Sequence, residues 1–76
     1  MGKLRIMSAT EVCRILINNG FREMRTSGSH IVMQRKIIGG QSATVTAIVP
    51  NHNELAIGTL LSIIRQSQLP RSLFES

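Results

Sequence analysis

Two short turn signals divide the middle of the chain and leave few folds open to it. The stretch SGS at 27–29 and the stretch GGQS at 39–42 combine glycine with small polar residues. The segments 21–26, 30–37 and 43–49 that they separate can form strands, with alternate residues pointing to opposite faces. Because short turns join antiparallel neighbours, the sequence predicts a three-stranded meander that Pro50 terminates.

A helix is predicted before the first strand, over residues 9–19. In SATE at 8–11, the Ser8 hydroxyl can accept from the Glu11 amide while the Glu11 side chain reaches back to the Ser8 amide, which is the capping-box pattern. Gly20 is expected to end the helix, because glycine adopts the left-handed C′ conformation without steric cost. Phe21 is then placed to fold back on the last helical turn.

A second amphipathic helix is predicted over residues 60–69, LLSIIRQSQL, after a loop at 51–59. Leu60, Ile63 and Ile64 form one apolar stripe at helical spacing. Arg65 lies near the C-terminal end, where a positive charge is favourable, and Pro70 is expected to close the helix.

The predicted order of elements is α-β-β-β-α, an α+β fold with the topology of a double-stranded-RNA-binding domain. Both amphipathic helices are expected on one face of the antiparallel sheet, which leaves the other face to solvent or a partner. The 76 residues should form a single domain, with a loose N-terminal arm at 1–7 and a short tail at 71–76. One architecture hosts many chemistries, so the fold alone does not establish a function.

The charge balance favours a polyanionic partner. Nine Lys and Arg residues stand against four Asp and Glu residues, for a formal net charge of +5, and cationic surfaces gain affinity for nucleic acid by releasing counterions. Only 3% of the residues are aromatic, which makes a base-stacking platform improbable. A nucleic acid would therefore be held mainly through its backbone.

Several other classes are excluded on composition. No apolar run approaches the length that crosses a bilayer, and the start lacks a signal-peptide core, so we expect a cytoplasmic protein with no membrane contact. Cys13 is the only cysteine, has no histidine at ligand spacing, and is expected to be a small buried apolar group. We predict no metal site and no small-molecule cofactor.

His30, at the start of the second predicted strand, is the sharpest catalytic candidate. A free imidazole titrates at about pH 6.5 and can both accept and donate a proton at cellular pH. A base that removes the 2′-hydroxyl proton of RNA lets that oxygen attack the adjacent phosphorus, and this route needs no metal. Spacing alone favours the simpler interpretation that His30 only begins a strand and bonds to the turn.

Cationic and polar residues near the first hairpin could bind the RNA. Arg25, Arg35 and Lys36 could supply a positive field, although strand alternation means that Arg35 and Lys36 cannot both lie on the face of His30. By parity, Gln34 and Lys36 are expected on the side of His30. Arg25, Gln34 and Lys36 are therefore candidate RNA-binding residues.

The turn and the second histidine allow more than one interpretation. Gly28 permits a positive φ in the turn and could also let a phosphate approach the backbone. Ser29 cannot build a hydrolase triad, because the chain contains no aspartate and its glutamates are dispersed. His52, in the loop PNHNE, is expected to satisfy backbone groups around the start of the second helix, with a second catalytic role as the alternative.

Three blocks of sequence, spread over most of the chain, resemble the HicA (YcfA-like) family of toxin–antitoxin ribonucleases. They are NNGF at 18–21, SGSHIVM at 27–33 and VPNHNELAIGTLLSIIRQ at 49–66. The resemblance extends from Ser8 to Leu69. One departure is Gln68, which stands where the family usually has glycine, so this helix end is expected to cap less well.

The resemblance implies a function and a partner. The family's catalytic histidine occupies the G-S-H position, so His30 would do the acid–base work in cleaving mRNA, with Gly28 and Ser29 beside it as RNA-binding residues. A HicB-type antitoxin would bind the toxin, cover the histidine face and block access of RNA.

Two alternatives remain beside a metal-independent mRNA interferase. The first is a non-catalytic double-stranded-RNA-binding module, which normally needs a lysine cluster opening its last helix, where this chain has GTLLS. The second is an interaction protein that acts only through its antitoxin.

Overall fold

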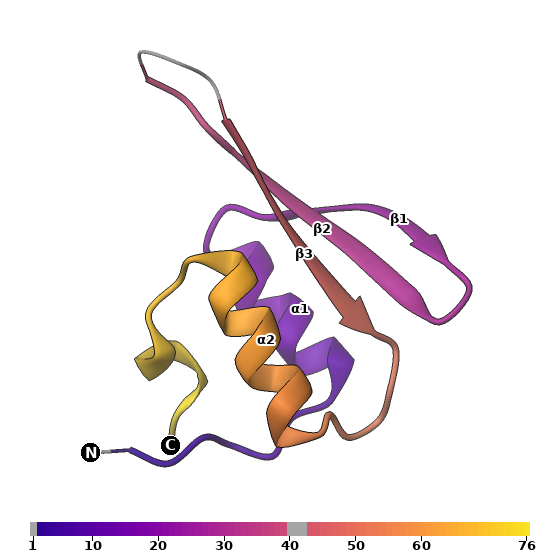
Figure 1. Ribbon diagram of the computed structural model, residues 1–76, viewed down its shortest axis with the longest axis vertical. Coiled ribbons are helices and arrows are strands. Elements are labelled where there is room, and N and C mark those ends of the chain that lie inside the picture. The colour runs from indigo at the N-terminus through magenta and orange to yellow at the C-terminus, as the bar shows by residue number, and fades with distance from the viewer. Residues whose placement is uncertain (1, 40–42) are drawn as a thin grey trace.

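The computed structural model describes residues 2–39 and 43–76, and it confirms the predicted fold class. A three-stranded antiparallel sheet, ordered β1-β2-β3, carries two helices in the order α-β-β-β-α (Figure 1). The elements are α1 (Ala9–Asn18), β1 (Arg22–Ser27), β2 (His30–Ile37), β3 (Ala43–Pro50), α2 (Ile57–Ser67) and a final 3-10 turn, η1 (Arg71–Phe74). The predicted second hairpin turn at 39–42 falls mainly outside the described residues.

Helix α1 has both of the end structures that the sequence predicts. At its start, the Ser8 hydroxyl oxygen accepts from the Glu11 amide at 3.2 Å, and Glu11 Oε1 accepts from the Ser8 amide at 3.0 Å. At its end, Gly20 has a φ of +95°, and the Phe21 amide donates back to the Leu16 carbonyl at 3.0 Å. Together with the bond from the Gly20 amide to the Ile17 carbonyl at 3.1 Å, this bond forms a Schellman motif. Both ends of α1 are therefore set by its own local sequence.

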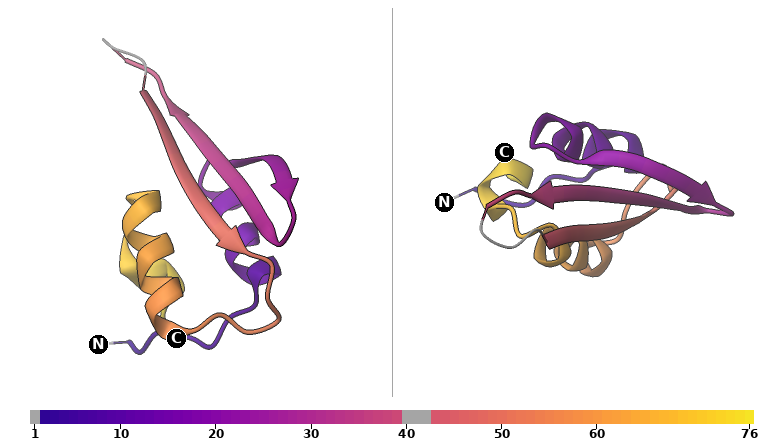
Figure 2. Two further views of the ribbon diagram at one scale, coloured as in Figure 1. Left: turned by 45° about the vertical axis from the view of Figure 1, so that its right-hand side comes forward. Right: turned by 90° about the horizontal axis from the view of Figure 1, so that it is seen from above.

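The core lies between the two helices and one face of the sheet. In Figure 2, seen from above, α1 lies toward the β1 side of the sheet and α2 toward β3. Most residues of this core come from the two helices and from the odd-numbered positions of β2 and β3, which include Met33, Val45, Ala47 and Val49. The even-numbered positions of these two strands therefore form the opposite face, which neither α1 nor α2 covers. We call it the open face.

Cys13 belongs to this core, as predicted. It is a free cysteine with 8% of its surface exposed. Burial raises the pKa of its thiol, and the nearby Glu23 carboxylate adds to the effect, because both disfavour a thiolate. The thiol is held in its neutral, weakly nucleophilic form.

Helix α2 begins three residues earlier than the sequence predicts and ends two residues earlier. No side chain caps its start at Ala56, so no capping signal marks the boundary. At its end, Gln68 takes the left-handed conformation, with a φ of +60°, at the position expected to cap poorly. The buried Ser67 hydroxyl donates to the Ile64 carbonyl at 2.8 Å and accepts from the Leu69 amide at 3.2 Å. Ser67 thus satisfies the helix end that lacks a glycine.

The two ends of the described chain pack against each other. Leu4 and Glu75 form an isolated antiparallel bridge, and the Arg5 amide donates to the Phe74 carbonyl at 3.0 Å. Met7 is 1% exposed and Phe74 is 0% exposed. This packing differs from the predicted loose arm at 1–7, because Met7 and Phe74 each supply a large apolar side chain to the core.

The capping box makes part of the stability depend on pH. Hydrogen bonding from the Ser8 amide holds the pKa of Glu11 below its usual value. Because the folded-state pKa is depressed, the contribution of Glu11 to stability is complete above the unfolded-state pKa of about 4.3 and is lost as the pH falls through the folded-state value.

We expect Glu11→Ala to be less stable than the native protein in urea unfolding at neutral pH, and the difference in stability to shrink toward pH 3. Glu54→Ala, which removes an exposed carboxylate, is the matched control. A difference that is constant with pH would contradict this role.

Candidate functional site

His30 lies at the end of the β1–β2 hairpin, on the open face of the sheet. It is the first residue of β2, where it pairs with Ser27 of β1 and with Pro50 of β3. Its side chain is exposed rather than buried in the core. A substrate in solution can therefore reach the imidazole.

The turn that precedes His30 consists of two residues, Gly28 and Ser29. Gly28 has a φ of +59°, while an added Cβ there would meet no atom within 4 Å. A positive φ at the first central residue is the requirement of a type II′ hairpin turn, which favours glycine. Gly28 is thus needed for its backbone conformation, and the space beside it is open to a ligand.

Hydrogen bonds connect this turn to the start of α1. The Asn51 amide donates to the Ser29 carbonyl at 2.6 Å, and the Ala9 amide donates to the His52 carbonyl at 2.9 Å. His52 therefore satisfies a backbone group of α1, whereas the sequence suggested the start of α2. Backbone hydrogen bonds therefore tie the turn before His30 to the loop after β3, and that loop to α1. We call this turn the braced turn.

The candidate RNA-binding residues of β2 share the open face with His30 but lie at increasing distances from it. Gln34 is opposite Thr46, and its amide nitrogen donates to the Thr46 hydroxyl at 3.3 Å. At 3.3 Å per residue, Gln34 is roughly 13 Å and Lys36 roughly 20 Å along the strand from His30. These two side chains cannot contact the same phosphate as His30.

A β-bulge brings two arginines of β1 to the open face. Arg22 lies opposite Gln34 and Arg25 lies opposite Val32, and the register shifts between Glu23 and Arg25. Simple alternation would place side chains three residues apart on opposite faces, but the extra bulge residue restores both arginines to one face. Arg25 is the cation of the open face nearest to His30. Arg22 was missed by the sequence analysis, because a bulge leaves no dependable local signal.

Arg35 is used for packing on the other face. Its guanidinium carbon lies 5.5 Å from the centre of the Phe21 ring, a cation–π distance. Its Nε is buried and has no hydrogen-bond partner among the described residues. A Cβ added to Gly20 would approach Arg35 Cδ to 3.1 Å. Arg35 is thus part of the structure around the end of α1, and it does not share the face of His30.

The open face is consequently cationic along its length. Arg22, Arg25 and Lys36 are exposed on it, whereas Glu23 lies opposite Met33 and so on the helix side. A hollow of about 260 Å³ lies at the end of the face remote from His30, lined by Gly20, Arg22, Met24, Gln34 and Lys36. Such a surface attracts a phosphate backbone.

Two further features bear on the class of protein. Within residues 2–39 and 43–76, no three His, Cys, Asp or Glu side chains are grouped as metal ligands would be. Neither helix in this part of the chain has the length and apolar character needed to traverse a bilayer.

Comparison with known protein families gives a match over most of the chain. Residues 9–69 match the family described as HicA toxin of bacterial toxin–antitoxin systems. The chain belongs to the HicA toxin family. The match includes both helices, the whole sheet, the turn before His30 and the loop after β3. No curated protein matches the chain.

Membership of the HicA toxin family makes the chain one half of a toxin–antitoxin pair, so an antitoxin is its partner. The matched segment ends before the final turn, η1, and begins after Ser8. The capping residue of α1, Ser8, and the packed chain ends therefore lie outside the matched segment.

Proposed function

We propose that this HicA toxin is a cytoplasmic endoribonuclease that cleaves mRNA with His30 as the acid–base group. The observation that carries the proposal is the exposed imidazole of His30 on a braced turn, at one end of a cationic face. Family membership supports the proposal that RNA is the target, because a toxin needs a target and this cationic face suits a polyanion.

The proposed reaction uses the nucleophile that RNA itself supplies. The imidazole of His30 accepts the 2′-hydroxyl proton, and the 2′ oxygen forms a bond to the adjacent phosphorus. The bond from phosphorus to the 5′ oxygen of the next nucleotide breaks, and that oxygen takes up the proton carried by the imidazolium. The products are a 2′,3′-cyclic phosphate and a 5′-hydroxyl end.

Neighbouring residues are proposed to stabilise and orient the phosphate. Arg25, which lies on the same face two pairs away along the ladder, can neutralise charge that builds on the phosphoryl oxygens. Gly28 leaves its backbone accessible, and the hydroxyl of Ser29 adjoins His30 in the chain. Arg22, Gln34 and Lys36 would bind flanking nucleotides through phosphates, because they lie too far away to reach the reacting one.

The antitoxin is proposed to be of the HicB type and to act by covering the open face. The catalytic imidazole and the cations of this face are exposed, so a protein seated on it would exclude RNA from all of them together. No internal segment of the described chain covers the face.

Product analysis tests the reaction directly. Purified toxin incubated with single-stranded RNA in EDTA should generate 2′,3′-cyclic phosphate and 5′-hydroxyl ends, detected by mass spectrometry and by resistance of the 3′ ends to ligation. Products with 3′-hydroxyl and 5′-phosphate ends, or cleavage that EDTA abolishes, would overturn the proposed route. Tight, length-dependent binding to duplex RNA without cleavage would favour the non-catalytic module instead. The first turn of α2, which begins at Ile57, holds no basic residue for such duplex binding.

A further inference from the structure

The two edges of the sheet, β1 and β3, differ in the hydrogen bonds that other parts of the described chain make to their backbone. At the β3 edge, the side chain of Gln66 from α2 accepts from the Ile48 amide at 2.9 Å. At the β1 edge, none of the hydrogen bonds among residues 2–39 and 43–76 joins a side chain or loop to the backbone of Arg22–Ser27. The backbone groups that β1 directs away from β2 are available to another strand.

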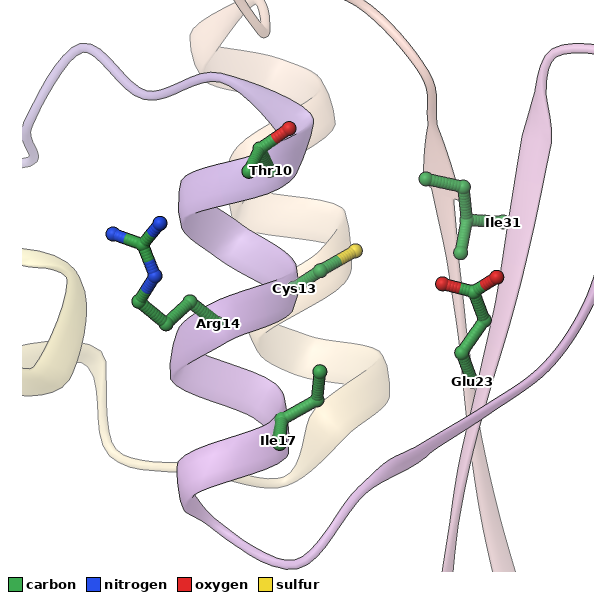
Figure 3. Close-up of a pocket in the computed structure, with 6 residues that line it drawn as sticks. All are labelled: Thr10, Cys13, Arg14, Ile17, Glu23 and Ile31. Carbon is green, nitrogen blue, oxygen red and sulfur yellow. The ribbon is translucent and has the colours of Figure 1, made fainter.

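A hollow lies on each side of this free edge, at the same level of the strand. On the helix side, a pocket of about 320 Å³ separates β1 from α1 (Figure 3). On the open face, the hollow of about 260 Å³ described above includes Arg22 and Met24. Glu23, which lies between these two residues in the chain, lines the helix-side pocket. Side chains of an added strand alternate between the two sides, so they would enter the two hollows in turn.

The two hollows differ in chemistry. Figure 3 shows Cys13 of α1 pointing across the helix-side pocket toward Ile31 and Glu23, while Arg14 points away from it. Ile17 adds a further apolar side chain, 53% exposed. This pocket suits an aliphatic side chain, and a carboxylate there would meet Glu23. The open-face hollow, by contrast, presents the cations of Arg22 and Lys36 and suits a carboxylate.

We propose that the free edge of β1 is a docking site for an extended, alternately acidic and aliphatic segment of a partner protein. The segment adds a fourth strand, with its acidic side chains over Arg22 and Lys36 and its aliphatic side chains between β1 and α1. A shift by one residue would bring its carboxylates to Glu23 and its aliphatic groups to the cations, so the two hollows select the register.

The same charges disfavour a second copy of this chain as the occupant. Two β1 strands placed edge to edge would bring Arg22 and Arg25 of each copy together, and like charges across a strand pair are destabilising. An acidic strand, in contrast, neutralises these arginines.

This inference rests on the proposed function only for the source of the segment, which is the antitoxin. Carboxylates held over Arg22 and Lys36 would occupy cations proposed to bind RNA, so docking at the edge and exclusion of RNA would reinforce each other. The docking itself is measured without any cleavage assay, and its failure would leave the ribonuclease proposal standing.

A short peptide tests the edge. An acetylated and amidated octapeptide of alternating glutamate and valine, added to ¹⁵N-labelled toxin at low salt, should shift the amide resonances of β1 and slow hydrogen exchange there. Ile17→Glu, which places a carboxylate in the helix-side pocket, should weaken this binding roughly tenfold or more, since burying one aliphatic side chain supplies about that much affinity. Ile57→Glu, at an equally exposed residue of α2, should bind like the native protein.

Two control peptides test whether binding requires negative charge and an alternating pattern, or only apolar side chains. A lysine–valine octapeptide and a block peptide of four glutamates followed by four valines should both bind at least tenfold more weakly. Equal binding of either control, shifts that map to β3, or equal effects of Ile17→Glu and Ile57→Glu would overturn the proposal. A concentration-dependent dimer in sedimentation, lost in Ile17→Glu, would assign the edge to a second copy instead. Ile17→Glu should keep full activity on RNA.

Discussion

Replacing His30 with alanine should reduce the rate of RNA cleavage by about 10²–10⁴-fold, the usual contribution of a general acid–base group. Among the described residues of the hairpin end, His30 supplies the imidazole that can act as a general acid or base, and the nearest cation, Arg25, can stabilise charge but cannot act as a base. Single-turnover cleavage of a labelled RNA, with toxin in excess, measures the chemical step without product release.

The control for this experiment is His52→Ala, which removes the second exposed imidazole. Only the backbone groups of His52 form hydrogen bonds among the described residues, so this variant should keep its activity within a few fold. His30 is exposed, so His30→Ala should retain the native melting temperature and bind RNA with little loss. Full cleavage by His30→Ala, or equal losses in both variants, would remove His30 from the mechanism.

The elements that the sequence predicted well are those whose limits are set by nearby residues. The ends of α1 follow from a hydroxyl, a carboxylate and a glycine within a few residues of each boundary, and the turn before His30 follows from Gly28. Helix α2 was predicted less accurately, because Ala56 gives no cap and Gly58 is a weak helix former at its start. Its first turn is held by tertiary packing, which local propensity does not report.

The same distinction between local and tertiary signals explains which residues of the candidate site could be placed from the sequence. The open-face positions of Gln34 and Lys36 follow from alternation along a regular strand, and the opposite placement of Arg35 follows from the same rule. Arg22 could not be placed that way, because the bulge between Glu23 and Arg25 changes the parity of β1. The distance from His30 to Lys36 was also overlooked, since sharing a face says nothing about separation along it.

The packing of the two chain ends shows a third reason why prediction from the sequence falls short. The bridge between Leu4 and Glu75 joins residues at opposite ends of the sequence, so neither segment carries a pattern that reveals the other. Phe74 was predicted to lie in a short tail, yet its side chain is fully buried in the core. A single aromatic residue in a polar segment has no periodicity from which burial could be inferred.

Phe74→Ala should therefore destabilise the domain severely, by about 3–5 kcal/mol in free energy of unfolding. A small domain of this size has a total stability of only about 4–11 kcal/mol, so this loss should lower the melting temperature by more than about 10 °C. The hydrogen bond from the Arg5 amide to the backbone carbonyl of residue 74 does not depend on the side chain, so the effect reports the loss of the buried ring. Urea unfolding followed by circular dichroism measures the change.

Leu73→Ala is the matched control, because Leu73 is the neighbouring apolar residue of η1 but is 37% exposed. Its loss should cost less than half as much, since a partly exposed side chain leaves a smaller cavity. Equal destabilisation by the two variants would mean that η1 as a whole, rather than the Phe74 ring, stabilises the core. A native-like melting temperature for Phe74→Ala would show that the tail does not contribute to folding. If Phe74→Ala is destabilised as expected, a segment outside the family match stabilises this HicA toxin, because the Phe74 ring fills part of its core.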